Sequence, residues 1–600
     1  MARTRTLSQG TIETILQSHS YLSDPKYLEF FALKNQSRRV ADLLAGIASS
    51  DRAKTSEEFL ENFETLTTNF SAAAGFARVH GLISGTEDAR AQALNVFEFV
   101  TGKANPKLTQ GQLEYYLFLL VHFERFEKAQ KLADEKFGLS DAAQIFKTAI
   151  SYRSDPKKWF ENFSKLFGKI GGQLAPLTPS ADSFRKLSVV DSIPKVTGPS
   201  LVSVIMTTYK PNADAEHAIN SILQQSYQNF ELIIVDDGSG PEFHDLLKRY
   251  QAKDDRIRLV LLEKNMGTYG ARNIGWLHAN GRYLTGQDSD DWSHPLRLEL
   301  QVKDLDAHPE HAGNWTRGIR VNEHLQLDVR DGNSPIRKGE RSVAVSMMIR
   351  HSPTLLRLGF FDGVRKAADT EYVQRMKAVF GPNSFGEIPE MLYVIQARYD
   401  SLSRTDFAPD WKHPNRQLYA TIYARWHRKI VSGREKSFFM PLENQRKFPA
   451  PFAFTPEAKR NVSRSFDVVF VGDWYSESTR QTWLRKQVTQ ALEKKLRVGF
   501  VHLDGFYRTV ARQGKPDEAI LKLYESGAVD FVALDDRNVE VKKLVVPAEY
   551  LPFAENKKSN LSVSAVELVS FRDSISELVE ISGECVLDLF GSKFSTVEAN

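Results

Sequence analysis

Cysteine is almost absent from this sequence, because Cys585 is the single cysteine among 600 residues. One thiol cannot form a disulfide within the chain, so a fold held together by internal disulfides is excluded. This composition fits a reducing compartment. We therefore expect a cytoplasmic protein, either free or at the inner face of the plasma membrane.

Long hydrophobic runs are lacking as well. The most apolar stretch, residues 113–123, is short and contains Glu114 and His122, and no apolar signal core follows the basic residues 1–6. A membrane-spanning helix needs about 20 mostly apolar residues. We expect no membrane span, and peripheral contact with a membrane surface stays open.

An excess of charge of one sign is also missing. The 79 Lys and Arg residues nearly balance 75 Asp and Glu residues, with a net charge of +4 and no long basic stripe. Nucleic-acid-binding proteins concentrate positive charge on one face, so we expect no nucleic-acid partner. The chain has an ordinary soluble composition, 42% hydrophobic and 26% charged, and room for three or four domains.

The most informative feature present is an acidic cluster, in which Asp288, Asp290 and Asp291 follow the strand-like run 281–285. Carboxylates this close repel one another. Mg²⁺ or Mn²⁺ relieves the repulsion, since both ions prefer oxygen ligands and commonly join a protein to phosphates. Alone, an acidic loop in solvent is the commoner explanation, so the neighbouring motifs decide.

Those motifs belong to an alternation of strands and helices. Runs rich in β-branched and aliphatic residues at 201–206, 230–235 and 257–262 predict strands, and residues 218–225 and 244–251 predict helices between them. This rhythm predicts a doubly wound α/β unit, in which ligands bind beyond the carboxyl ends of the strands. Polar clusters follow each predicted strand, namely Thr207 with Tyr209, Asp236 with Asp237, residues 265–270 and residues 288–291.

Four segments carry a resemblance to a known family. Residues 202–209, 233–239, 265–273 and 288–291 resemble, in order and spacing, the successive signatures of the family 2 glycosyltransferases with the GT-A fold. The resemblance covers residues 199–403, about a third of the chain. Each motif alone is weak, whereas the ordered set is specific.

The resemblance implies a nucleotide-sugar site. Thr207, Tyr209 and Asp237 match the family positions that hold the nucleotide base, usually uracil. Arg272 lies in the segment that approaches the nucleotide, where a guanidinium can pair with phosphate. Packing for Tyr209 and a structural ion pair for Arg272 are the alternatives.

The same resemblance gives roles to the acidic cluster. It implies that Asp288 lies near the ribose and the metal, that Asp290 is the principal ligand of Mn²⁺ or Mg²⁺, and that Asp291 supports the metal shell or the donor sugar. The implied donor is a UDP-linked sugar.

The family's base motif matches residues 367–372, and Asp369 falls at the general base of inverting members. Glu371 is the rival, and on a helix two residues this far apart do not share a face. Asp369 also suits a helix N-terminus, which would be a structural role. The acid that usually precedes the base is replaced by Ala368, and Arg398 stands where many relatives have a histidine. Arginine cannot bind a metal but can neutralise a leaving diphosphate.

The rest of the chain predicts further domains. Helical spacing of apolar residues, for example over 27–47, predicts an all-α domain in residues 1–170, either a layer packed on the catalytic unit or a docking surface for a protein partner or a long acceptor. We expect a linker at 171–198, the GT-A domain at 199–405 and a helical or irregular connector at 406–462. Residues 463–600 predict a second Rossmann-like α/β unit resembling half of a GT-B glycosyltransferase, either truncated or used for binding and assembly.

Together these features predict a metal-dependent, inverting glycosyltransferase. It would move a sugar to a hydroxyl of a glycan or lipid-linked glycan in surface polysaccharide synthesis. Two alternatives remain: a non-catalytic sugar-nucleotide-binding scaffold, and a bifunctional polymerase with a second site in the C-terminal unit.

Overall fold

The structure is a computed structural model that describes most of the chain. The described residues are 24–50, 55–104, 106–138, 140–167, 173–180, 182–190, 193–327, 343–398, 407–408, 411–442, 446–460, 462–505, 516–554, 559–572 and 574–599, with Ser8, Thr11, Thr14 and Ala53. Within them, no helix is both long enough and apolar enough to cross a membrane.

The N-terminal part is all-helical, as predicted; we call residues 24–167 the helical region. Its helices are α2 (Pro25–Asn35), α3 (Arg38–Ala48), α4 (Ser56–Leu66), α5 (Phe70–Ser84), α6 (Glu87–Lys103), α7 (Gln110–His122), α8 (Phe126–Phe137), α9 (Asp141–Ser154) and α10 (Pro156–Lys165). Most begin at a side chain that accepts a hydrogen bond from the first turn: Asp24, Ser37, Thr55, Asn69, Thr86, Thr109, Ser140 and Asp155. The apolar run 27–47 is two helices rather than one, because Gln36 is left-handed and Ser37 caps a new helix.

The first α/β unit, residues 199–398, is built on an eight-stranded sheet of order β3-β2-β1-β4-β7-β6-β8-β5. Its strands are β1 (Val202–Thr208), β2 (Phe230–Asp236), β3 (Ile257–Leu261), β4 (Tyr283–Asp288), β5 (Trp292–Ser293), β6 (Gly313–Val321), β7 (Met348–Arg350) and β8 (Phe385–Gln396). Strands β1 to β4 are parallel, and β7 runs antiparallel to β4 and β6.

Helices cover both faces of this sheet. They are α11 (Ala213–Leu223), α12 (His244–Gln251), α13 (Thr268–Leu277), α14 (Arg297–Ala307), α16 (His351–Leu358) and α17 (Ala368–Phe380). Strand β1 is buried along its whole length, as a central parallel strand must be. Val204 packs in the cluster that contains α11, α12 and α14, whereas Ile205 packs in the cluster that contains α13 and α17.

The C-terminal unit, residues 462–599, is a parallel six-stranded sheet of order β13-β12-β11-β14-β15-β16. Its strands are β11 (Arg464–Gly472), β12 (Val498–His502), β13 (Val529–Phe531), β14 (Val539–Pro547), β15 (Ser562–Ser570) and β16 (Phe594–Glu598), with helices α19 (Thr479–Glu493), α20 (Glu518–Glu525) and α21 (Ser576–Phe590). Numbered within the unit, this is the 3-2-1-4-5-6 order of Rossmann sheets. The predicted fold class is therefore confirmed in all three parts.

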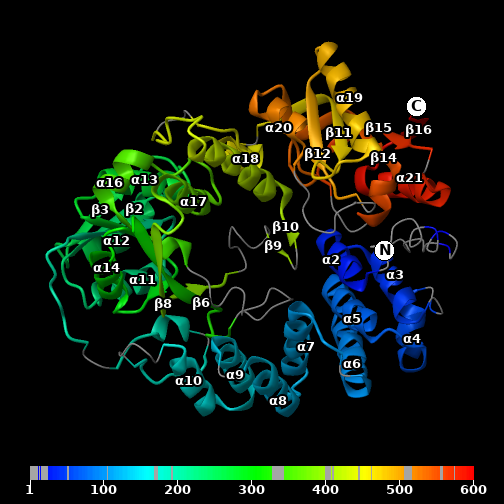
Figure 1. The fold of residues 1–600 in the computed structure, drawn as a ribbon. Helices are drawn as coiled ribbons and strands as arrows, with labels where there is room; N and C mark the ends of the chain where they lie inside the picture. The colour runs from blue at the N-terminus through cyan, green and yellow to red at the C-terminus, as the bar shows by residue number, and fades with distance from the viewer. Residues whose placement is uncertain are drawn as a thin grey trace.

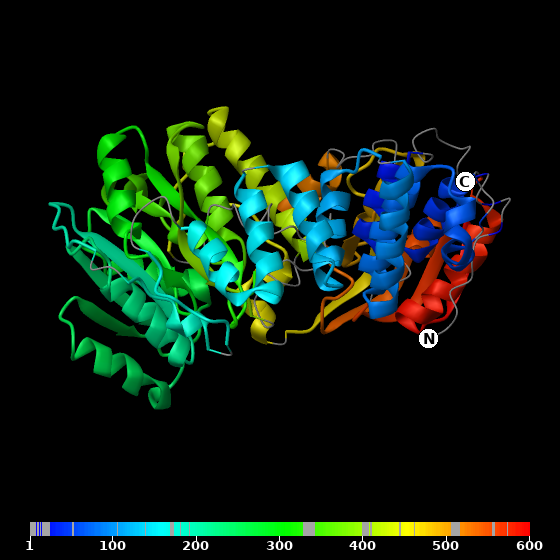
Figure 2. The same cartoon turned by 90° about the horizontal axis from the view of Figure 1, so that it is seen from below.

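The helical region joins the two α/β units. Helices α2 and α3 lie beside the C-terminal unit (Figures 1 and 2), and they share one hydrophobic core with β11, β14 and β15. At the other end of the region, Trp159 and Phe163 of α10 pack with Trp292 and Val394 of the first sheet. Residues far apart in the sequence thus form common cores.

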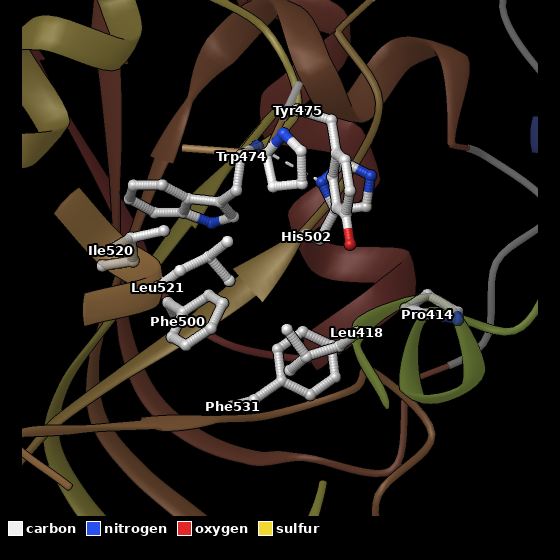
Figure 3. Close-up of a pocket in the computed structure, with 10 residues that line it drawn as sticks. Pro414, Leu418, Trp474, Tyr475, Phe500, His502, Ile520, Leu521 and Phe531 are labelled. Atoms are coloured by element: carbon white, nitrogen blue, oxygen red, sulfur yellow. Dashed lines mark hydrogen bonds between the residues drawn. The ribbon is translucent and has the colours of Figure 1, made fainter. Parts of the chain in front are cut away.

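The connector also touches both α/β units through α18 (Pro414–Val431). Pro414 and Leu418 line a small pocket with Trp474, Tyr475 and His502 of the C-terminal unit (Figure 3). Further along, Arg425 forms ion pairs with Glu518 at 2.5 Å and Glu525 at 3.0 Å.

Candidate active site

The predicted site lies at one edge of the first sheet, where β1, β2 and β4 end. The register places Thr207 beside Asp288 on β4, and Thr208 beside Asp236 on β2. Parallel pairing therefore brings the polar ends of β1 and β4, Thr207 and Asp288, to a single edge although they are 81 positions apart in sequence, as the pattern of motifs predicted.

The acidic turn is stabilised by the side chain of Gln287, which is fully buried. Its Nε2 donates to the carbonyl oxygens of Asp288 and Asp291 at 3.1 and 3.0 Å, and its Oε1 accepts from Ser293 Oγ at 2.6 Å. The turn is thus fixed by buried hydrogen bonds, and its carboxylates do not have to hold it together.

The three carboxylates of the turn differ in orientation. Asp291 is 3% exposed and its Oδ1 accepts from the backbone N–H of Gln396, so it anchors the end of β8. Asp288 is more exposed and its Oδ1 accepts from Arg272 Nη2 at 2.6 Å. Within the described residues, Asp288, Asp290 and Asp291 do not bring one carboxylate oxygen each to within 4.8 Å of the other two.

Electrostatics single out Asp290. Burial and the neighbouring Asp288 carboxylate raise the pKa of Asp290 to about 6, against an opposing effect of Arg398. Burial, followed by Asp290 and Asp288, raises the pKa of Asp291 well above its ordinary value. The turn therefore concentrates negative charge that a cation would relieve.

A hard divalent cation fits Asp288 and Asp290. Proteins commonly hold Mg²⁺ through one or two carboxylates while substrate phosphates and water complete the shell, so the carboxylates of Asp288 and Asp290 are enough. Asp291, whose Oδ1 bonds to β8, is placed to support the turn.

Arg272 lies between the acidic turn and Asp369, the predicted general base. It is buried, pairs with Asp288, and its guanidinium lies 5.4 Å from the ring centre of Tyr269. Asp369 contributes to the electrostatic environment of both Arg272 and Tyr269, and burial followed by the Asp369 charge raises the pKa of Tyr269. The predicted metal and base sites therefore share neighbours.

Asp369 and Glu371 lie on opposite sides of α17. Asp369 is in the first turn, partly exposed, and its Oδ1 accepts from the Thr370 backbone N–H. Glu371 is fully buried and paired with Arg375 at 3.1 Å and His427 at 3.0 Å. Glu371 thus joins α17 to α18, and its carboxylate is not available to a substrate in this structure.

Asp237 organises the candidate pocket for the nucleotide base. Its two carboxylate oxygens accept from the backbone N–H groups of Met266 and Gly267, at 2.6 and 2.9 Å. The carboxylate thus fixes the loop that follows β3. Thr207, at the end of β1, is buried. The Tyr209 ring is 52% exposed, and the Lys210 ammonium lies 5.4 Å from its centre. An exposed ring at this edge suits stacking better than core packing.

Arg398 lies just beyond the end of β8. Its Nη1 is 3.4 Å from Asp214 Oδ2, and its charge is felt by Asp290. The predicted arginine therefore stands beside the metal end of the site.

Sequence reasoning missed two buried groups behind the turn. Tyr393 is fully buried and its hydroxyl accepts from the Asp288 N–H at 3.1 Å. Arg297 is fully buried, donates to the Gly286 carbonyl at 2.9 Å, and burial lowers its pKa to about 10. Their positions depend on β5–β8 pairing, which no local pattern announces.

Comparison with protein families confirms the resemblance. The family model described as Glycosyl transferase family 2 matches residues 203–356. This segment includes Thr207, Asp237, Arg272 and the acidic turn, and it ends before Asp369 and Arg398.

Curated relatives match over part of the chain. An uncharacterized glycosyltransferase of Haemophilus influenzae is 41% identical over 102 residues, 17% of this chain and 41% of that protein. TuaG of Bacillus subtilis, whose name assigns it to teichuronic acid biosynthesis, is 42% identical over 103 residues, 17% of this chain and 41% of TuaG. The match thus spans about two fifths of the length of these relatives. MJ1057 of Methanocaldococcus jannaschii, an uncharacterized glycosyltransferase, is 28% identical over 242 residues, 38% of this chain and 80% of that protein.

Solved structures are more distant. TarS residues 1–349 of S. aureus in complex with UDP-GlcNAc has 18% identity and a TM-score of 0.31, covering 39% of this chain and 70% of that one. The mannosyltransferase PcManGT of Pyrobaculum calidifontis, in complex with GDP-Man and Mn²⁺, has 17% identity and a TM-score of 0.29, covering 49% and 77%.

Proposed function

We propose that this chain, whose residues 203–356 match the family 2 glycosyl transferases, is a metal-dependent, inverting glycosyltransferase. It moves a sugar from a nucleotide sugar, UDP-linked in our proposal, to a hydroxyl of a glycan or lipid-linked glycan. The observation that carries the proposal is that Arg272, which pairs with Asp288 of the acidic turn, also interacts electrostatically with Asp369.

Each part of the site has a task in this reaction. Thr207, Tyr209 and Asp237 bind the base, with Tyr209 offering an exposed ring. Arg272 and Arg398 lie where positive charge stabilises a diphosphate. Asp288 and Asp290 hold Mn²⁺ or Mg²⁺, which when bound supplies positive charge to the leaving diphosphate.

Asp369 is the base in this proposal. It accepts the proton of the acceptor hydroxyl while that oxygen attacks the anomeric carbon from the face opposite the diphosphate. A single displacement inverts the configuration at that carbon. An ordinary carboxylate is a weak base in water, so contact with the acceptor has to form in a water-poor site.

The connector forms the acceptor side. Tyr423 of α18 lies close enough to Asp369 for their charges to interact, and burial, Glu371 and Asp369 raise the pKa of Tyr423 to about 12. The Tyr423 hydroxyl therefore stays neutral near neutral pH. It can donate a hydrogen bond to an acceptor sugar or to Asp369 itself.

The biological setting is part of the same proposal. The likeness to TuaG, whose name refers to teichuronic acid, supports a role in surface polysaccharide synthesis. A cytoplasmic location, contact with the inner face of the plasma membrane and a protein partner for the helical region complete it.

The C-terminal unit serves assembly in this proposal rather than as a second transferase site. Asp504, just after β12, pairs at 2.6 Å with Lys34 of the helical region. Asp504 lies at the carboxyl end of β12, where Rossmann sheets bind ligands, and in this protein it forms an ion pair with a residue of the same chain.

Donor hydrolysis tests the proposal. A panel of UDP-, GDP-, CDP- and dTDP-sugars is incubated with the wild type and with Asp290→Ala, in Mn²⁺ or in EDTA. We expect release of nucleoside diphosphate from at least one donor, in Mn²⁺ only, and a loss of about 100-fold or more in the variant. Binding of donors without turnover across the panel, in the presence of glycan acceptors, would instead support the scaffold alternative.

A further inference from the structure

The linker before the first α/β unit docks against the predicted site. Its short helix η2 (Phe184–Lys186) inserts Phe184, which is 1% exposed, with its ring 5.6 Å from that of His217 on α11. The Phe184 N–H also donates to the Glu323 carbonyl at 3.1 Å. Phe184 belongs to the same hydrophobic cluster as Trp292, the residue after the acidic turn. The position of the next residue, Arg185, is therefore well fixed.

Arg185 and Arg398 meet on one carboxylate. Asp214, buried in the first turn of α11, accepts from Arg185 Nε through Oδ1 at 2.7 Å and contacts Arg398 Nη1 through Oδ2 at 3.4 Å. Arg185 precedes the first strand of the sheet in the sequence, and Arg398 follows the last. Each carboxylate oxygen of Asp214 nevertheless contacts one of them.

This pair stands beside the acidic turn. Asp291 Oδ1 bonds to the Gln396 N–H at 3.0 Å, and Arg398 follows two residues later. Arg398 is thus tied to the turn through β8, and Arg185 is tied to Arg398 through Asp214.

Both arginine side chains of the pair reach solvent. The side chains of Arg185 and Arg398 are 44% and 40% exposed, whereas Asp214 is 6% exposed. The other carboxylate near Arg185, Asp182, lies at 3.4 Å and is itself 63% exposed. Two guanidiniums held by one buried carboxylate are therefore partly open to solvent beside the acidic turn.

We propose that Arg185 and Arg398, both positioned by Asp214, bind the diphosphate of the donor. The inference rests on the proposed function and adds a donor-binding residue from outside the segment that matches the family. Planar guanidiniums suit the oxygen pairs of phosphate groups, and a metal held by the turn would add positive charge to the same diphosphate. Asp214 is a positioning residue, because it orients both guanidiniums without touching the donor.

The test is calorimetric titration with nucleoside diphosphates and Mn²⁺, using UDP, GDP, CDP and dTDP, and with the matching nucleosides. The variants are Arg185→Gln, Arg185→Lys, Asp214→Asn and, as a matched control from the same linker helix, Lys186→Gln. We expect Arg185→Gln and Asp214→Asn to weaken diphosphate binding about tenfold or more, since a charged hydrogen bond is lost. Nucleoside binding stays unchanged, Arg185→Lys recovers part of the affinity, and Lys186→Gln behaves as the wild type.

The outcomes separate this inference from the function beneath it. Wild-type binding of a diphosphate with equal binding by Arg185→Gln would overturn the inference alone. Equal losses of diphosphate and nucleoside affinity, with a lower melting temperature, would also overturn it, because Arg185 would then be structural. A wild type that binds none of the four diphosphates with Mn²⁺ would defeat the proposed function itself.

Discussion

At the scale of single residues, the ionised carboxylate of Asp290 is costly to the folded state, and a bound metal would offset this cost. Its pKa is raised from 3.8 to about 6, so the folded protein holds this proton more tightly than the unfolded chain. The stability of the folded state must then fall as the pH rises from about 4 to about 6. Above that range the charged carboxylate is unfavourable by on the order of 1 to 3 kcal/mol when no metal is bound.

Asp290→Asn should therefore raise the melting temperature at pH 7.5 in EDTA, while transfer activity is lost. The gain should vanish near pH 4, where the wild-type carboxyl is protonated. Thermal unfolding at both pH values measures it.

Asp288→Asn is the matched control, and it should have the opposite effect. Arg272 is buried and paired with Asp288, so the variant leaves a buried cation without its partner and should cost about 1 to 3 kcal/mol. Stabilisation by both substitutions, or by neither, would contradict this view of the turn.

Asp369 should act in the chemical step alone. Asp369→Asn should lower kcat by about 100- to 10,000-fold, the usual contribution of a general base, with unchanged affinity for nucleoside diphosphate. Steady-state kinetics and calorimetry check both values. Asp245, an exposed acid in the first turn of α12, provides a control for a helix N-terminal role: Asp245→Asn should leave kcat unaltered. Wild-type turnover by Asp369→Asn would remove Asp369 from the mechanism.

The sequence predicted these residues unevenly. Asp288, Asp290 and Asp369 belong to short motifs at strand and helix ends, so their positions could be predicted from the local sequence. The inward turn of Asp291 depends on a hydrogen bond to Gln396, 105 positions away. The burial of Glu371 depends on His427 in a helix whose docking no motif announces.

At the scale of elements, a buried charged network holds α17 to α18, beside the proposed acceptor side. Glu371, Arg375 and His427 form a buried network between the two helices. Glu371→Gln removes the counter-charge of a fully buried arginine and should cost about 3 to 5 kcal/mol, measured by urea denaturation.

Glu387→Gln is the control for this prediction, since Glu387 pairs with Arg317 at the surface and its loss should cost at most about 1 kcal/mol. A similar cost for both substitutions would show that the buried network does not hold α17 to α18. The kcat of Glu371→Gln should fall less than that of Asp369→Asn.

Element boundaries were predictable where local chemistry sets them. The strands of the first α/β unit follow from side chains within a few residues of each end. The break at Gln36 and Ser37 lies inside the apolar run 27–47, whose helical spacing does not show it. The linker was predicted only as a connector, because its role depends on Phe184 contacting α11 and the turn after β6, which is a tertiary property.

At the scale of the whole molecule, the first helices complete the core of the last domain. Phe31 of α2 is 2% exposed, and its ring meets that of Phe553 edge-on at 6.4 Å. Arg39 of α3 donates to the Pro552 carbonyl at 2.5 Å. Composition and spacing predicted both parts but not their union, because no periodicity encodes which surfaces meet across 500 residues.

Phe31→Ala should therefore destabilise the C-terminal unit by about 3 to 5 kcal/mol. Hydrogen exchange should rise in β14 and β15 and stay unchanged in β1 and β2. Phe30, partly exposed on the same helix, gives the control Phe30→Ala with a smaller effect. Unchanged exchange in β14 and β15 would mean that the shared core is not a thermodynamic unit.

The central claim is that the carboxyl edge of the first sheet is the donor site. A crystal structure with a UDP-sugar and Mn²⁺ tests it most directly. We predict the base beside Tyr209 and Asp237, Mn²⁺ bound by Asp290, the diphosphate against Arg398 and Arg185, and the anomeric carbon facing Asp369. Nucleotide bound in the C-terminal unit, or at this edge with no metal on Asp290, would contradict the account.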